Sequence, residues 1–152
     1  MKAIQINPKY IEWISADEMH EASKKWLSEL QFIADEHLFF QDLVKTYRLQ
    51  LLNTDEFSDT VEIIDVLNRS QKRNNELIKI VRDHENGLEI MVDGINQPKE
   101  ESTYKSDHKQ LVETMSEFYK EYTDLKTQLF QVIKSGIKKE KQEHLLDNKD
   151  NL

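Results

Sequence analysis

The sequence predicts an all-α protein, an up-down-up antiparallel bundle of three long helices with an N-terminal arm packed on it. Over three long stretches, apolar residues recur at alternating three- and four-residue steps, which is the pattern of a helix buried along one side. The 152 residues include only 3 Gly and 2 Pro, whereas β-sandwiches and doubly wound folds need many more turn residues. This length fits one domain, which we place at residues 1–146.

The first helix is preceded by an arm, residues 1–14, whose apolar side chains can pack back on the bundle. Pro8 disfavours helix immediately before it. Ser15 and Glu18 then have the spacing of a capping box, in which each side chain binds the other residue's backbone N–H. We therefore expect the first helix to run from about Ala16 to about Leu52.

Acidic residues, glycine and proline indicate where the second and third helices begin and end. The second helix is expected from Asp55 or Asp59 to about Asp93. A loop over residues 94–102 follows, because Gly94 suits a helix C-terminus and Pro98 cannot continue a helix. The third helix is expected from about Thr103 to about His144, and residues 147–152 are expected to be a disordered tail. Short connections make neighbouring helices antiparallel.

Composition narrows the classes of function. The net charge of −8 argues against binding to nucleic acid, which requires a basic surface. The absence of cysteine removes thiol catalysis and Cys-ligated metals, and it is compatible with the cytoplasm. No apolar run approaches the roughly 20 residues that cross a bilayer, so we expect a cytoplasmic protein without a membrane partner.

Three polar residues lie on the predicted buried stripes near the middle of the bundle. Folding the chain about its two loops brings His37 level with Gln71, within a turn of Ser70 and Asn74. Buried polar groups need hydrogen-bond partners, and a layer of such groups fixes the register of helices at some loss of stability. We therefore predict a buried polar layer of His37, Ser70 and Asn74.

The same alignment brings three histidines to one end of the bundle. His20, His84 and His108 lie within about two turns of one another, with Asp17 nearby. Three imidazoles and a carboxylate have the chemistry to bind Zn²⁺ or another divalent metal. The alternative interpretation is that these are ordinary histidines of amphipathic helices near a solvated end.

The first helix is apolar over a wider arc than one stripe requires. Phe39, Phe40, Leu43 and Val44 cannot all face one core. Either the N-terminal arm covers the apolar side chains that do not face the core, or these side chains form an interface with a second copy or a partner helix. We predict a homodimer, or a partner-bound form, built around these four residues.

No catalytic motif accompanies these features, and no catalytic residue is assigned. The sequence contains no Gly-rich phosphate loop, no His-Glu-x-x-His and no Gly-x-Ser-x-Gly. The predicted function is that of a structural or protein-interaction bundle without a cofactor. The alternative is a small metal-binding bundle that uses the histidine cluster.

Overall fold

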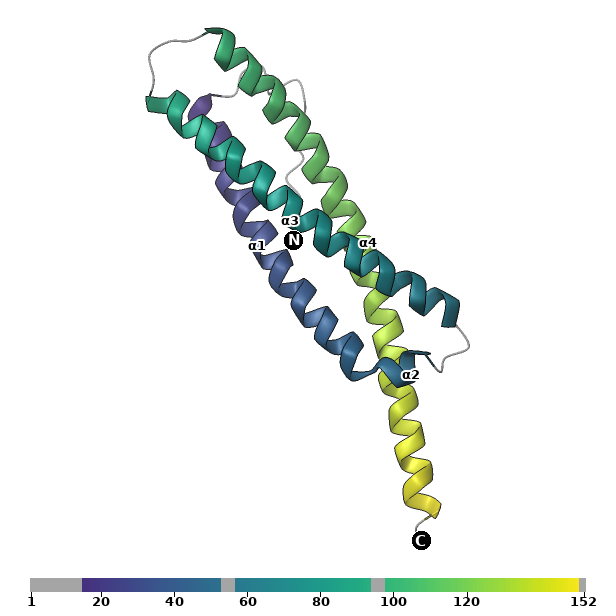
Figure 1. The fold of residues 1–152 in the computed structure, drawn as a ribbon. Helices are drawn as coiled ribbons and strands as arrows, with labels where there is room; N and C mark the ends of the chain where they lie inside the picture. The colour runs from purple at the N-terminus through teal and green to yellow at the C-terminus, as the bar shows by residue number, and fades with distance from the viewer. Residues whose placement is uncertain (1–14, 53–56, 94–97, 151–152) are drawn as a thin grey trace. The chain divides into compact units, whose positions relative to one another are not determined.

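The computed structural model describes residues 15–52, 57–93 and 98–150, which contain helices and no strand (Figure 1). The helices are α1 (Ala16–Thr46), α2 (Arg48–Leu52), α3 (Phe57–Asp93) and α4 (Pro98–Asp150). The long helices pack as a bundle, in which α3 runs antiparallel to α1 and α4. The all-α, up-down-up fold is therefore confirmed. The expected arm, residues 1–14, and the Gly94 cap lie outside the described residues.

Ser15 caps the N-terminus of α1, which is one of the two bonds of the predicted capping box. The Ser15 Oγ accepts a hydrogen bond from the Glu18 backbone N–H at 3.2 Å. Asp17 and Glu18 place negative charge in the first turn, where the helix dipole is positive. Met19 follows as the first fully buried residue of the helix. The cap thus sets where α1 begins.

The first helix is not continuous to Leu52, because it is interrupted at Tyr47 and resumes as α2. The Thr46 Oγ1 donates to the Asp42 carbonyl at 2.8 Å. A threonine hydroxyl that bonds the carbonyl four residues earlier tends to bend a helix. Ser23, Thr127 and Ser135 make the same kind of bond inside continuous helices, so this bond alone does not account for the interruption. The short α2 brings Leu51 into the core, where it is 1% exposed.

The last helix is longer than expected at both ends. It begins at Pro98, because proline is tolerated in the first turn of a helix, where its missing N–H has no intrahelical acceptor. Pro98 therefore starts α4, contrary to the expected loop. At the other end α4 continues past His144 to Asp150. Residues 147–150, which were expected in a disordered tail, are helical.

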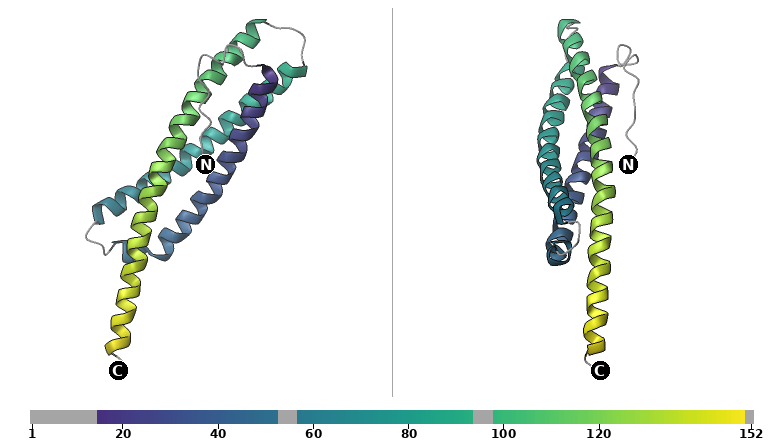
Figure 2. Two further views of the ribbon diagram at one scale, coloured as in Figure 1. Left: turned by 180° about the vertical axis from the view of Figure 1, so that it is seen from behind. Right: turned by 90° about the vertical axis from the view of Figure 1, so that its right-hand side faces the viewer.

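Contacts within the chain divide it into two compact units. Unit 1 consists of Met1–Ala34 and Arg73–Glu121, and unit 2 consists of Asp35–Lys72 and Tyr122–Leu152. Each unit contains segments of α1, α3 and α4, which lie side by side within it (Figure 2). The fully buried apolar residues of unit 1 include Met19, Leu30, Leu77, Leu88 and Met115.

The core of unit 2 gathers residues from all four helices. Its buried members are Phe40, Val44, Leu51, Leu67, Leu125, Leu129 and Ile133. The apolar stripe that the sequence predicts along the third long helix is buried in both units. Leu111 and Phe118 are buried in unit 1, and Tyr122, Leu125 and Leu129 are buried in unit 2.

Gly87 lies inside α3 because Tyr104 occupies the space that a side chain would fill. A Cβ built on Gly87 would overlap the Tyr104 hydroxyl oxygen and lie 2.7 Å from its Cε1 atom. Gly87→Ala should therefore lower the free energy of unfolding by roughly 1–3 kcal/mol, the usual cost of overpacking. In a helix without such an overlap, the same substitution would instead raise the free energy of unfolding by about 1 kcal/mol.

Gly136→Ala is the matched control for this substitution, and urea unfolding followed by circular dichroism is the measurement. A Cβ at Gly136 would lie 2.9 Å from the Cδ2 atom and 3.5 Å from the Cγ atom of Leu51, which is a milder overlap than the one at Gly87. The gain in helix propensity offsets this milder overlap, so Gly136→Ala should lose less stability than Gly87→Ala. Equal losses in the two variants would contradict the proposed role of Tyr104.

Candidate functional site

Two of the three clustered histidines form a buried pair in unit 1. His84 on α3 and His108 on α4 approach through a hydrogen bond of 3.1 Å between His84 Nε2 and His108 Nδ1. His108 is completely buried and His84 is 8% exposed. The indole of Trp26, on α1, stacks on the His108 ring with centroids 4.9 Å apart. The pair therefore links α3 to α4 and is covered by α1.

Burial lowers the pKa of both histidines. Desolvation, together with a smaller effect of like-charge repulsion from the neighbouring His84, lowers the pKa of His108 to about 4. Desolvation also lowers the pKa of His84, although the Asp107 carboxylate opposes this effect. Both rings are therefore neutral at pH 7. One ring donates its N–H, and the other accepts with a nitrogen lone pair.

The other two candidate metal ligands are not part of this pair. His20 lies 3.6 Å from the Glu85 carboxylate, measured from His20 Nε2 to Glu85 Oε1. Asp17 is exposed in the first turn of α1. Within residues 15–52, 57–93 and 98–150, no group of three or more His, Asp or Glu side chains has the arrangement of a metal site. The structure therefore brings together two of the four candidates, as a hydrogen-bonded pair.

A groove in unit 1 runs beside the histidine pair, between α3 and α4. It has a volume of about 670 Å³, within the range of small-molecule sites. Leu77, Ile80 and Leu111 supply apolar lining, while His84 and Asp107 contribute polar groups. No convergent set of a nucleophile, a base and an oxyanion donor is found among the residues described, so this groove does not indicate a reaction.

The predicted polar layer is found in part, with a different partner for one member. His37 Nε2 lies 2.9 Å from Ser70 Oγ in unit 2, as the alignment predicts. Asn74, which is fully buried in unit 1, instead donates from its Nδ2 to the Leu30 carbonyl at 3.0 Å. A helix carbonyl has a second lone pair that can accept such a bond. Sequence spacing does not reveal backbone acceptors of this kind.

A further polar cluster in unit 2 was not predicted. The Tyr122 hydroxyl donates to Glu36 at 3.3 Å, and the Lys126 ammonium forms an ion pair with the same carboxylate at 3.1 Å. Burial raises the pKa of the Tyr122 hydroxyl, and the Glu36 charge raises it further. A buried tyrosine needs a partner for its hydroxyl, which is the only signal in the sequence for this cluster.

The apolar arc of α1 divides between the core and the surface of unit 2. Phe40 and Val44 are buried, and Leu43 is half-buried against the core. Phe39 is 55% exposed. The interface predicted from four residues is therefore corrected, because two of them already fill the core of their own chain.

Phe130 of α4 is also exposed beside Phe40, and no pattern in the sequence predicts this. It is 53% exposed and meets Phe40 edge-on, with ring centroids 5.4 Å apart. The Phe39 ring centroid lies 5.8 Å from that of Phe40. We define Phe39, Leu43 and Phe130 as the aromatic surface of unit 2.

Comparisons of the chain with models of protein families, with curated proteins and with solved structures give no match. Over the described ranges, no helix has both the length and the apolar character needed to span a bilayer. The interpretation of function therefore depends on the surface and the site geometry of this chain alone.

Proposed function

We propose that this protein is a structural, protein-interaction bundle that associates with a second copy through the aromatic surface of unit 2. The observation that carries this proposal is the distribution of exposed apolar side chains. Among the described residues, nine large hydrophobic side chains are exposed, and seven of them belong to unit 2: Leu38, Phe39, Leu49, Val61, Phe130, Leu145 and Leu146. Exposed apolar patches with polar rims are typical of protein interfaces.

A second copy is the simplest partner for this surface. A two-fold axis makes one patch self-complementary, so Phe39 and Phe130 of one copy can cover the same residues of the other. Phe39, Phe40 and Phe130 already pack at aromatic distances within one chain. Aromatic side chains contribute large contact area and dominate the energetics of interfaces. A cytoplasmic location, compatible with the absence of cysteine, belongs to the same proposal.

Phe39→Glu should reduce the mass of the assembly formed by the wild-type chain, which weighs 18.1 kDa as a monomer. A carboxylate at this position would be desolvated without a partner in the interface, which is strongly unfavourable. Sedimentation velocity over a wide range of protein concentration is the measurement. Because Phe39 is exposed, circular dichroism should show that the helices of the variant are intact.

Ile80→Glu is the matched control. Ile80 is also an exposed apolar residue, at 43%, but it lies on α3 within unit 1. We expect its replacement to leave the mass of the assembly unchanged. If both variants sediment like the wild type, or if both lose association to the same extent, the aromatic surface is not the site of self-association.

A further inference from the structure

The groove beside the histidine pair of unit 1 changes in character along its length. The hydrogen bond between His84 and His108 sets the register of α3 and α4 within this unit. At this end the groove is lined by Asp83 and Asp107, each of which is adjacent in sequence to one of the bonded histidines. Towards the start of α3 a strip of three apolar side chains follows: Ile80, Leu111 and Leu77. The groove is therefore acidic at one end and apolar in its middle.

The two carboxylates at the acidic end have no cationic partner in the described part of the chain. Neither Asp83 nor Asp107 forms an ion pair or a hydrogen bond with another described residue. Arg73, the one arginine or lysine among the described residues that line the groove, lies at its opposite end. The Arg73 guanidinium is already paired with the Glu76 carboxylate at 3.5 Å. The acidic end thus carries two negative charges that a ligand can balance.

His84 adds a buried polar atom at the same end of the groove. It is 8% exposed, and its Nε2 atom is engaged with His108 Nδ1 at 3.1 Å. Its other ring nitrogen, Nδ1, has no hydrogen-bond partner among the described residues. Buried polar groups are generally hydrogen-bonded, so this nitrogen is a group for a ligand to satisfy. When His84 donates to His108 through Nε2, its Nδ1 lone pair can accept a hydrogen bond.

We propose that this groove binds a primary alkylamine, with the ammonium group at the acidic end and the alkyl chain along the apolar strip. An ammonium group has three N–H donors, and the acidic end offers three acceptors: the carboxylates of Asp83 and Asp107 and His84 Nδ1. The apolar strip favours a cation that carries an alkyl chain over a bare metal ion. The inference concerns unit 1, and it goes beyond the self-association proposed for unit 2.

The length of the apolar strip sets the length of the chain that fits. His84 and Leu77 are separated by about 10 Å along the axis of α3. An extended chain advances about 1.2 Å per bond, so an octyl chain covers this distance. Each methylene that is fully buried raises affinity about fourfold. Affinity should therefore increase from butylamine to octylamine and then level off, because a longer chain reaches the charged Arg73.

The test is an NMR titration of the ¹⁵N-labelled full chain with octylamine at pH 7. We expect saturable changes in the amide signals of residues 77–84 and 103–111, with the helical content unchanged by circular dichroism. Octanol and octanoate are the matched probes, since they keep the chain and replace the cation by a neutral or a negative group. Octanol should bind at least threefold more weakly than octylamine, and octanoate should give no saturable change.

Asp83→Asn and Asp107→Asn test the acidic end in the protein. Both residues are exposed, so neither substitution disturbs the core. Each should weaken octylamine binding roughly threefold, and the double variant about tenfold, as expected for partly exposed ion pairs. Glu113→Gln is the matched control, because Glu113 is exposed on α4 in unit 1 but does not line the groove. It removes the same charge and should leave the affinity unchanged.

The alternative outcomes overturn the proposal in distinguishable ways. If octylamine produces no saturable changes, or changes spread over the whole chain, the groove is not an amine site. If the double variant binds octylamine as tightly as Glu113→Gln does, the attraction arises from the net charge of −8 rather than from the acidic end. Octanol that binds as tightly as octylamine excludes a role for the ammonium group. Octanoate that binds more tightly assigns the polar head group to Arg73 instead.

Discussion

Phe118→Ala should lower the free energy of unfolding by about 3–5 kcal/mol. Phe118 is 5% exposed in the core of unit 1, with its ring centroid 6.3 Å from that of Tyr119. Truncation removes buried apolar surface and leaves a cavity that helices held by neighbouring contacts can close only in part. Equilibrium unfolding in guanidinium chloride, followed by circular dichroism, measures the loss.

Phe32→Ala is the control for this prediction, because Phe32 belongs to the same unit but is 56% exposed. Its replacement should change the free energy of unfolding by no more than about 0.5 kcal/mol, as is usual for surface positions. Losses of similar size at Phe118 and Phe32 would show that the third stripe does not form the core of unit 1.

Long-range periodicity made the bundle predictable. Leu111, Phe118 and Leu125 recur at seven-residue intervals, and a helix can bury such a stripe only against other helices. Helix boundaries were less predictable than the helices themselves. No residue pattern around Tyr47 indicates the interruption there, and Pro98 is compatible with a first turn although it would break an interior one.

The candidate sites were predictable only where side chains meet side chains at the same level of the bundle. Folding the chain about its loops places His37 beside Ser70, and the structure pairs them. The alignment does not reveal that Asn74 donates to the Leu30 carbonyl, because every helix residue carries a carbonyl and spacing does not distinguish among them. The alignment also does not show that Phe130 is exposed beside Phe40, since rotation of a helix by a fraction of a turn decides which of its side chains face outward.

Acidification should destabilise the protein through the His84–His108 pair. Unfolded histidines bind a proton near pH 6.5, whereas burial lowers the pKa of folded His108 to about 4. Between these values the unfolded state binds more protons than the folded state, so the free energy of unfolding falls as the pH falls. Above pH 6.5 both states hold His108 neutral, so its burial does not reduce the free energy of unfolding. Between pH 6.5 and 4, the free energy of unfolding should decrease by about 3 kcal/mol.

Replacing both histidines by phenylalanine isolates this contribution. His84→Phe/His108→Phe removes both hydrogen-bonding partners together, so neither ring leaves an orphaned nitrogen behind. An aromatic ring at position 108 can still stack on Trp26, which lies 4.9 Å from the His108 ring in the wild type. The double variant should therefore have a shallower dependence of stability on pH between 6.5 and 4.

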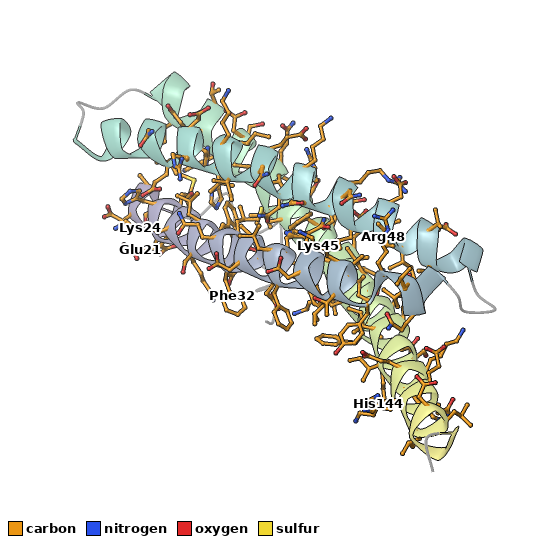
Figure 3. The ribbon with its side chains drawn as sticks, turned by 60° about the horizontal axis from the view of Figure 1, so that its bottom comes forward. Glu21, Lys24, Phe32, Lys45, Arg48 and His144 are labelled. Carbon is orange, nitrogen blue, oxygen red and sulfur yellow. The ribbon has the colours of Figure 1, made fainter. Side chains whose placement is uncertain are left out.

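The measurement is urea unfolding at half-unit intervals between about pH 4 and 7.5, compared with the wild type. Carboxylates also titrate in this range, but they are common to both proteins and cancel in the difference between the two curves. His144→Gln is the control, because His144 is exposed on α4 (Figure 3) and its loss should leave the wild-type curve unchanged. A double variant that follows the wild-type curve throughout would show that the buried pair does not couple protonation to folding.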